Sequence, residues 1–119
     1  MTYLPDIHRL LPSSPESEKG VLSSFILSPL EVAQICAIEG IEANRFHFPA
    51  HAKVFAVLLE MMAKCQPVDF VTLMNSLRAS CSLDAIGGPG FVTELFTFLP
   101  TASNVRHYIA EMNRDFMAR

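Results

Sequence analysis

Two histidines lie close enough in the sequence to suggest metal chemistry. His47 and His51 are four residues apart, a spacing that places two imidazoles on one face of a helix. A zinc site needs a third and usually a fourth ligand, and the HExxH pattern needs a glutamate directly after the first histidine. Phe48 follows His47 instead, and Pro49 lies between the two histidines. We therefore predict no metal site, with His51 packed in the first turn of a helix and His47 in an exposed loop.

The cysteines offer no better candidate for catalysis. Cys36, Cys65 and Cys81 form no CxxC pair, and an odd number of cysteines cannot all pair within one chain. A nucleophilic thiol needs a positioned base or a dipole that favours the thiolate. Cys65 lies at the expected C-terminal end of a helix, where the helix dipole disfavours the thiolate. We predict reduced cysteines in the core or on helix faces.

A glycine-rich segment at residues 87–90, GGPG, suggests a phosphate-binding loop. A Walker A loop has the pattern GxxxxGK[ST] after a strand, whereas this segment has no lysine and no preceding strand. The acidic residues are also scattered: Glu31, Glu39 and Glu60 form no evident pair for acid–base catalysis. We therefore predict no catalytic, cofactor-binding or metal-binding residue in this chain.

The composition indicates one cytoplasmic domain that meets a partner. The chain has 119 residues, which fits a single core. It is 50% hydrophobic and 18% charged, against about 25% charged in an average soluble domain. This shortfall predicts apolar surface that another copy or another protein covers.

No apolar run approaches the roughly 20 residues that cross a membrane, and the N-terminus does not resemble a signal peptide. We predict a cytoplasmic protein without membrane contact.

The charge distribution argues against nucleic-acid binding by this chain alone. The net charge is −3 with neutral histidines, and the nine lysines and arginines are spread along the sequence. Binding to the phosphate backbone needs concentrated positive charge. The sequence therefore predicts that the isolated chain binds DNA poorly.

Prolines, glycines and small polar residues divide the sequence into helical segments. Pro15 lies in the first turn of the first helix, with Ser13 or Ser14 as its cap. Further helices are expected at roughly 29–39, from Pro49 to Gln66-Pro67, after Asp69, from Pro89 to Pro100, and from Ser103 or Asn104 onward. The clearest helical period is His51, Val54, Phe55, Leu58, Leu59 and Met62. Because no segment shows a convincing strand pattern, the sequence predicts an all-α fold, a compact bundle of about six helices.

The last two helices carry apolar residues that a single core does not require. On the fifth helix, Phe98 falls outside the single apolar stripe that would face the core, and we predict it as a possible partner surface. The last helix has an apolar stripe and reaches Arg119 without a typical C-terminal signal, so we expect it to continue in the natural protein. We expect neighbouring copies to shelter this stripe, which consists of Val105, Tyr108, Ile109, Met112 and Phe116.

Five segments, in the same order, resemble the N-terminal domain of DnaB-type replicative DNA helicases. They are residues 11–22 (LPSSPESEKGVL), 46–55 (FHFPAHAKVF), 66–73 (QPVDFVTL), 86–88 (IGG), and 100–105 (PTASNV) followed by Tyr108. The corresponding family segments have a Glu-x-Glu pair, Phe-Tyr-x-Pro-x-His, Pro-Ile-Asp-x-Val-Thr-Leu, Val-Gly-Gly and Pro-Ser-Ala-x-Asn-Val-x-x-Tyr. Each match alone is weak, but the order of all five is specific.

The resemblance implies how the chain is organised and how it assembles. The residues before the first helix predict a flexible leader at 1–12. The resemblance implies a globular helical bundle at 13–100, followed by the first helix of a helical hairpin at 101–119. Hairpins from two subunits would pair, and three such dimers would form a collar on a hexameric motor. The oligomer interface would then include Val105, Tyr108, Ile109, Met112 and Phe116. Aspartate at Ile109 or Met112 is expected to weaken self-association without loss of helicity.

The resemblance also implies partners, which are other copies of the chain, primase, and a helicase loader or initiator. DNA would be contacted only through the whole hexamer. ATP and Mg²⁺ would belong to a separate RecA-like motor domain, so this domain would need no cofactor. One alternative is a free-standing helicase partner, such as a loader or the C-terminal domain of a primase. Another is a small metal-dependent or cysteine enzyme, and stoichiometric zinc that is lost on His51→Ala would support this alternative.

Overall fold

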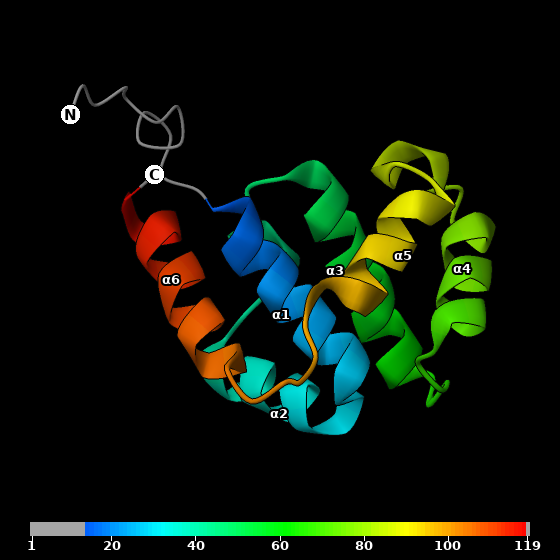
Figure 1. Cartoon of the computed structure of the whole chain (residues 1–119). Helices are drawn as coiled ribbons and strands as arrows, with labels where there is room; N and C mark the ends of the chain where they lie inside the picture. The colour runs from blue at the N-terminus through cyan, green and yellow to red at the C-terminus, as the bar shows by residue number, and fades with distance from the viewer. Residues whose placement is uncertain (1–13, 119) are drawn as a thin grey trace, which may run out of the picture.

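The computed structural model describes residues 14–118 (Figure 1). Within this range the chain forms six α-helices and two short 3-10 helices, without a strand. The α-helices are α1 (Pro15–Leu27), α2 (Pro29–Glu39), α3 (Pro49–Ala63), α4 (Phe70–Ala79), α5 (Pro89–Phe98) and α6 (Val105–Ala118). The 3-10 helices are η2 (Ala43–Arg45) and η3 (Asp84–Ile86). The predicted all-α bundle is confirmed, while the predicted leader at 1–12 lies outside the described residues.

Local sequence signals set most of the helix boundaries. The Ser14 side chain accepts a hydrogen bond from the Ser17 N–H at 3.1 Å and caps α1. Asp69 and Thr72 form a reciprocal capping box at the start of α4. Prolines occupy the first turn of α1, α2, α3 and α5, where the missing N–H removes no helical hydrogen bond. Gly40 ends α2 with a φ of 70°, a conformation that favours glycine.

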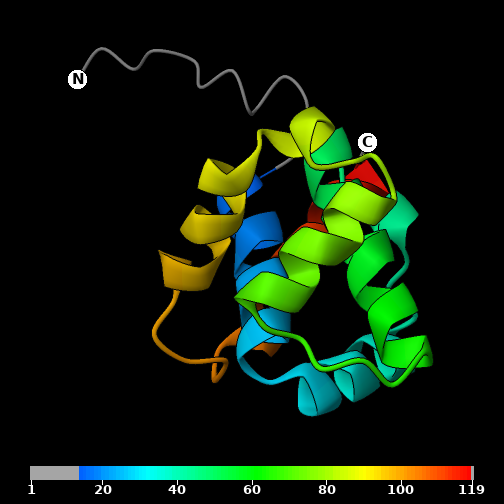
Figure 2. The ribbon, with the colours of Figure 1, turned by 90° about the vertical axis from the view of Figure 1, so that its right-hand side faces the viewer.

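α1 is the central helix of the bundle (Figure 1). It packs against α6 on one side and against α5 and α3 on the other, while α2 packs near its C-terminal end. α4 packs against α3 and α5 (Figure 2). Because four helices surround α1, it buries Ser17, Glu18 and the whole segment from Gly20 to Ile26. Since α6 also packs on α1, the described residues form one bundle, and the assignment of 101–119 to a hairpin stays a prediction.

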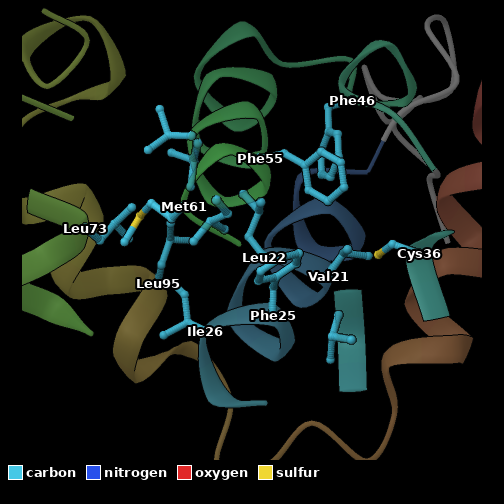
Figure 3. Packing of buried hydrophobic residues seen from close by; sticks show 14 of the residues in the cluster. Val21, Leu22, Phe25, Ile26, Cys36, Phe46, Phe55, Met61, Leu73 and Leu95 are labelled. Carbon is cyan, nitrogen blue, oxygen red and sulfur yellow. The ribbon is translucent and has the colours of Figure 1, made fainter. Parts of the chain in front are cut away.

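The core lies between α1, α3 and the helices around them (Figure 3). Phe55 of α3 is fully buried, with its ring centroid 6.0 Å from that of Phe25 and 4.8 Å from that of Phe46. The predicted stripe of α3 is largely correct, but Leu59 is 36% exposed because it lies at the edge of the buried face. None of the described helices is both long and apolar enough to span a membrane.

Candidate protein interaction site

Most of the predicted interface residues of α6 are buried in the core of this chain. Val105, Ile109 and Met112 are only 3%, 2% and 1% exposed, because their helix face packs against α1. The apolar stripe is therefore covered by the same chain at these three positions, and a second copy is not needed to shelter it. A partner could contact these side chains only if α6 left α1. Their role in assembly stays a prediction, whereas their role in the core is visible.

Tyr108, the fourth predicted interface residue, fixes how closely α6 approaches α1. It is half-buried, and its ring lies against the backbone of Gly20. A Cβ added at Gly20 would lie 2.6 Å from Tyr108 Cγ, far inside van der Waals contact. Beside this contact, the Ser17 hydroxyl donates a hydrogen bond of 3.1 Å to Glu111 Oε1. Small residues on α1 therefore let the aromatic ring of α6 lie directly on the helix backbone.

Phe116, the fifth predicted residue, is also half-buried. The guanidinium carbon of Arg45 lies 4.7 Å from the centroid of the Phe116 ring, within the range of a cation–π contact. Arg45 also donates to the side-chain oxygen of Asn113. Contacts therefore hold α6 along its length, from Val105 in its first turn to Phe116 near its end.

Because the inner face of α6 is buried against α1, only its outer, solvent-exposed face is accessible to a partner. Its exposed residues include Arg106, His107, Arg114 and Met117, and Met117 is 79% exposed. Arg106 Nη1 lies 3.8 Å from Glu39 Oε2 in an exposed ion pair. This face is polar and of mixed charge, and it does not match the predicted apolar interface.

Phe98, the predicted partner surface on α5, is half-buried rather than fully exposed. Lys19 Nζ lies 5.9 Å from the centroid of the Phe98 ring, and the same ammonium group pairs with Glu94. The Phe98 ring is therefore partly covered by a charged side chain of α1. Its use by a partner stays a prediction.

A buried carboxylate that the sequence analysis missed connects α1 to the segment before α3. Glu18 is 1% exposed, and its Oε1 lies 2.8 Å from Nδ1 of His51. The backbone N–H groups of His47 and Phe48 donate to the same carboxylate at 2.6 Å and 3.3 Å. The His51 ring also stacks on Phe91 of α5, with centroids 5.6 Å apart and an angle of 11° between the planes. We call these groups the Glu18 cluster.

The Glu18 cluster explains why His47 and His51 occur at their positions. His51 is buried in the first turn of α3, as predicted, and one of its ring nitrogens contacts Glu18. His47 is half-buried rather than exposed, and it contributes its backbone N–H. In the described part of the chain, no three histidine, cysteine or acidic side chains gather closely enough to hold a metal ion. The missed signal was an acidic residue at a position of the apolar stripe of α1, because a buried carboxylate requires hydrogen-bond donors.

The thiol of Cys36 faces the core from α2. Burial, together with the nearby Glu39 carboxylate, raises the pKa of the Cys36 thiol to about 11. At neutral pH this thiol is therefore protonated and packs as a small apolar group. At the start of α4, hydrogen bonds from the Thr72 N–H and hydroxyl lower the pKa of the Asp69 carboxyl. Asp69 is thus ionised in its role as a helix cap.

Comparisons with known proteins agree with the observed fold. A family model described as the DnaB-like helicase N terminal domain matches residues 10–114. The replicative DNA helicase DnaB of Geobacillus stearothermophilus is 38% identical over 100 residues, which are 84% of this chain and 22% of that protein. The DnaB of Treponema pallidum is 32% identical over the same shares of the two chains.

A solved structure adds the three-dimensional comparison. The N-terminal domain of DnaB helicase from Mycobacterium tuberculosis matches with a TM-score of 0.82 and 28% identity, covering 91% of this chain and 74% of that one. The chain spans about a fifth of the length of the helicases it matches, since the shares are 22%. With nearly all of its described residues inside the family match, this chain belongs to the DnaB-like helicase N-terminal domain family.

Proposed function

We propose that this chain is the N-terminal collar module of a replicative DNA helicase, with a role in assembly and docking rather than in chemistry. The observation that carries the proposal is the family match over residues 10–114. The similar fold of a DnaB N-terminal domain supports it, as do relatives that are themselves named replicative DNA helicases.

The nature of the polar groups supports a non-catalytic role. Glu18 and His51 are both buried, and their polar atoms contact each other and the backbone. Such groups stabilise the bundle and are not directed at a substrate. In this proposal, ATP and Mg²⁺ bind to a separate motor part of the helicase, and the collar module needs no cofactor.

The proposed partners follow from the collar role. Copies of the module would pair as dimers, and three dimers would form the collar of a hexamer. Primase and a helicase loader or initiator would dock on this collar, and DNA would be contacted only through the whole hexamer. The buried stripe of α6 means that pairing would use other surfaces of the domain, or would require α6 to leave α1.

The test is to express the complete reading frame that encodes this chain and a version that lacks residues 14–118. Native mass spectrometry and ATPase assays would be run on both proteins and on the chain alone. We expect a hexameric ATPase from the complete frame, impaired assembly without the domain, and no ATP hydrolysis by the chain alone. A reading frame that ends near Arg119, and whose product binds a separate helicase, would instead identify a free-standing helicase partner.

A further inference from the structure

The outer face of α2 carries large apolar side chains that no described residue covers. Leu30 and Ile38 are 73% and 78% exposed, and they lie two helical turns apart on the same face. Gln34 and Ala37, which are also exposed, lie between them on that face. We call these four residues the α2 face. Apolar side chains that gather on one exposed face often mark a site of protein interaction.

The α2 face continues into a groove at the N-terminal end of the helix. The groove has a volume of about 480 Å³ and lies between the start of α2, the end of α3 and the α3–α4 connection. Leu30 belongs both to the α2 face and to the groove wall, which also includes Met62, Pro67 and Val68. Figure 2 shows α2 and the end of α3 together at the lower end of the bundle. An elongated apolar surface with a recess at one end fits a helix that inserts one large side chain.

The segment that carries the α2 face is acidic. Between Lys19 and Arg45 the sequence contains no lysine, arginine or histidine, but it contains Glu31, Glu39 and Glu42. Three glutamates and no base give this segment a charge of −3, equal to the net charge of the whole chain. All three glutamates are exposed, and Glu39 is contacted at 3.8 Å by Arg106. A partner that covers Leu30 therefore meets the exposed carboxylate of Glu31 beside it.

We propose that the α2 face docks a basic amphipathic helix of another protein. The apolar side of that helix would cover Leu30 and Ile38 and insert a large side chain into the groove, and its lysines or arginines would lie near Glu31. A second copy of this chain fits less well, because two α2 faces in a symmetric pair would bring like charges together. The inference does not depend on the helicase assignment, since it uses only the exposure, shape and charge of this surface.

The experiment uses two designed helical peptides of about 14 residues, long enough to span the α2 face. Both have the same leucine stripe, and they differ in carrying lysines or glutamates beside it. Peptide binding to the ¹⁵N-labelled chain is followed by NMR, and affinity is measured by fluorescence anisotropy. We expect the lysine peptide to shift the amides of residues 30–42, 62–66 and 68 and to bind more weakly at higher salt. The glutamate peptide should bind at least about tenfold more weakly.

Surface variants then connect the binding to named residues. The double variant Leu30→Ser, Ile38→Ser should lose at least about tenfold in affinity for the lysine peptide, since both side chains lose apolar contact. The variant Glu31→Gln should reduce the salt dependence. Met117→Ser, an equally exposed apolar residue on α6, is the matched control and should bind normally.

Three results would overturn the proposal. One is equal affinity for the two peptides or no binding of either, and another is a set of shifted amides away from α2 and the groove. The third is self-association of the chain, measured by sedimentation equilibrium, that the double variant at Leu30 and Ile38 abolishes. That result would assign the α2 face to a second copy.

Discussion

α6 and α2 both pack against α1, yet their apolar residues end up in different places. The large apolar residues of α6 recur every three or four residues and therefore lie on one face of the helix. On this face Val105, Ile109 and Met112 are buried against α1. α2 is apolar around most of its circumference, so burying its inner face still leaves Leu30 and Ile38 exposed. An amphipathic stripe shows that a helix face is covered, but it does not show whether the same chain or a partner covers it. A helix with more apolar residues than one face can hold is the better indicator of a partner.

The largest difference between α6 and α2 is expected when an aspartate replaces one isoleucine on each helix and the unfolding free energies are compared. Ile109→Asp places a carboxylate in the core beside α1, and we expect a loss of at least about 4 kcal/mol in the free energy of unfolding. Ile38→Asp changes an exposed position, and we expect a change within about 0.5 kcal/mol. Urea denaturation followed by circular dichroism measures both. The sequence-based expectation that Ile109→Asp preserves helicity is thus revised, and equal stability of the two variants would contradict the burial of α6.

A second test addresses α1, the helix that supports both α6 and α2. Glu18→Ala leaves His51 and two backbone N–H groups buried without their acceptor, and we expect a loss of about 3 kcal/mol in unfolding free energy. Glu60→Ala, which removes an exposed carboxylate of α3, is the control and should change stability by less than about 0.5 kcal/mol. A small effect at Glu18 would mean that water or another group replaces the lost acceptor. The Glu18 cluster would then not be what orients the segment before α3.

The sequence predicted the helices well because their boundaries depend on local signals. Pro15, Asp69 and Gly40 act through their own backbone geometry or through hydrogen bonds to near neighbours. The Glu18 cluster and the docking of Tyr108 on Gly20 connect residues far apart in the sequence. Sequence period shows which side of a helix is apolar, but it does not show which helix covers that side. The sequence alone therefore does not distinguish cover of the α6 stripe by α1 from cover by a neighbouring copy.

A third test changes the distance between α6 and α1. Gly20→Ala places a methyl group 2.6 Å from Tyr108 Cγ, so α6 must shift, and we expect a loss of about 2 kcal/mol. Gly90→Ala on α5 is the matched control, because an added Cβ there meets nothing within 4 Å. Thermal unfolding would compare the two variants with the double variant Gly20→Ala, Tyr108→Ala. If removing the Tyr108 ring does not recover part of the stability lost at Gly20, the close approach of the two helices is not the cause.

The smallest expected effect concerns the inner face of α2. The pKa of the Cys36 thiol is raised from 9.0 to about 11 by burial, so the folded state disfavours the thiolate. The resulting contribution to stability is fully present below pH 9.0 and is lost as the pH rises toward about 11. We therefore expect the unfolding free energy of the wild type to fall more steeply over this range than that of Cys36→Ala.

The comparison with Cys36→Ala isolates this thiol, because lysines, tyrosines and the exposed Cys65 and Cys81 titrate in both proteins. Guanidinium denaturation at several pH values between 8 and 11 would provide the two curves, each under reducing conditions. Parallel curves would show that Cys36 is as accessible to water as the exposed thiols. In that case α2 would be loosely held on its inner face as well, and the exposure of Leu30 and Ile38 would reflect a mobile helix rather than a docking surface.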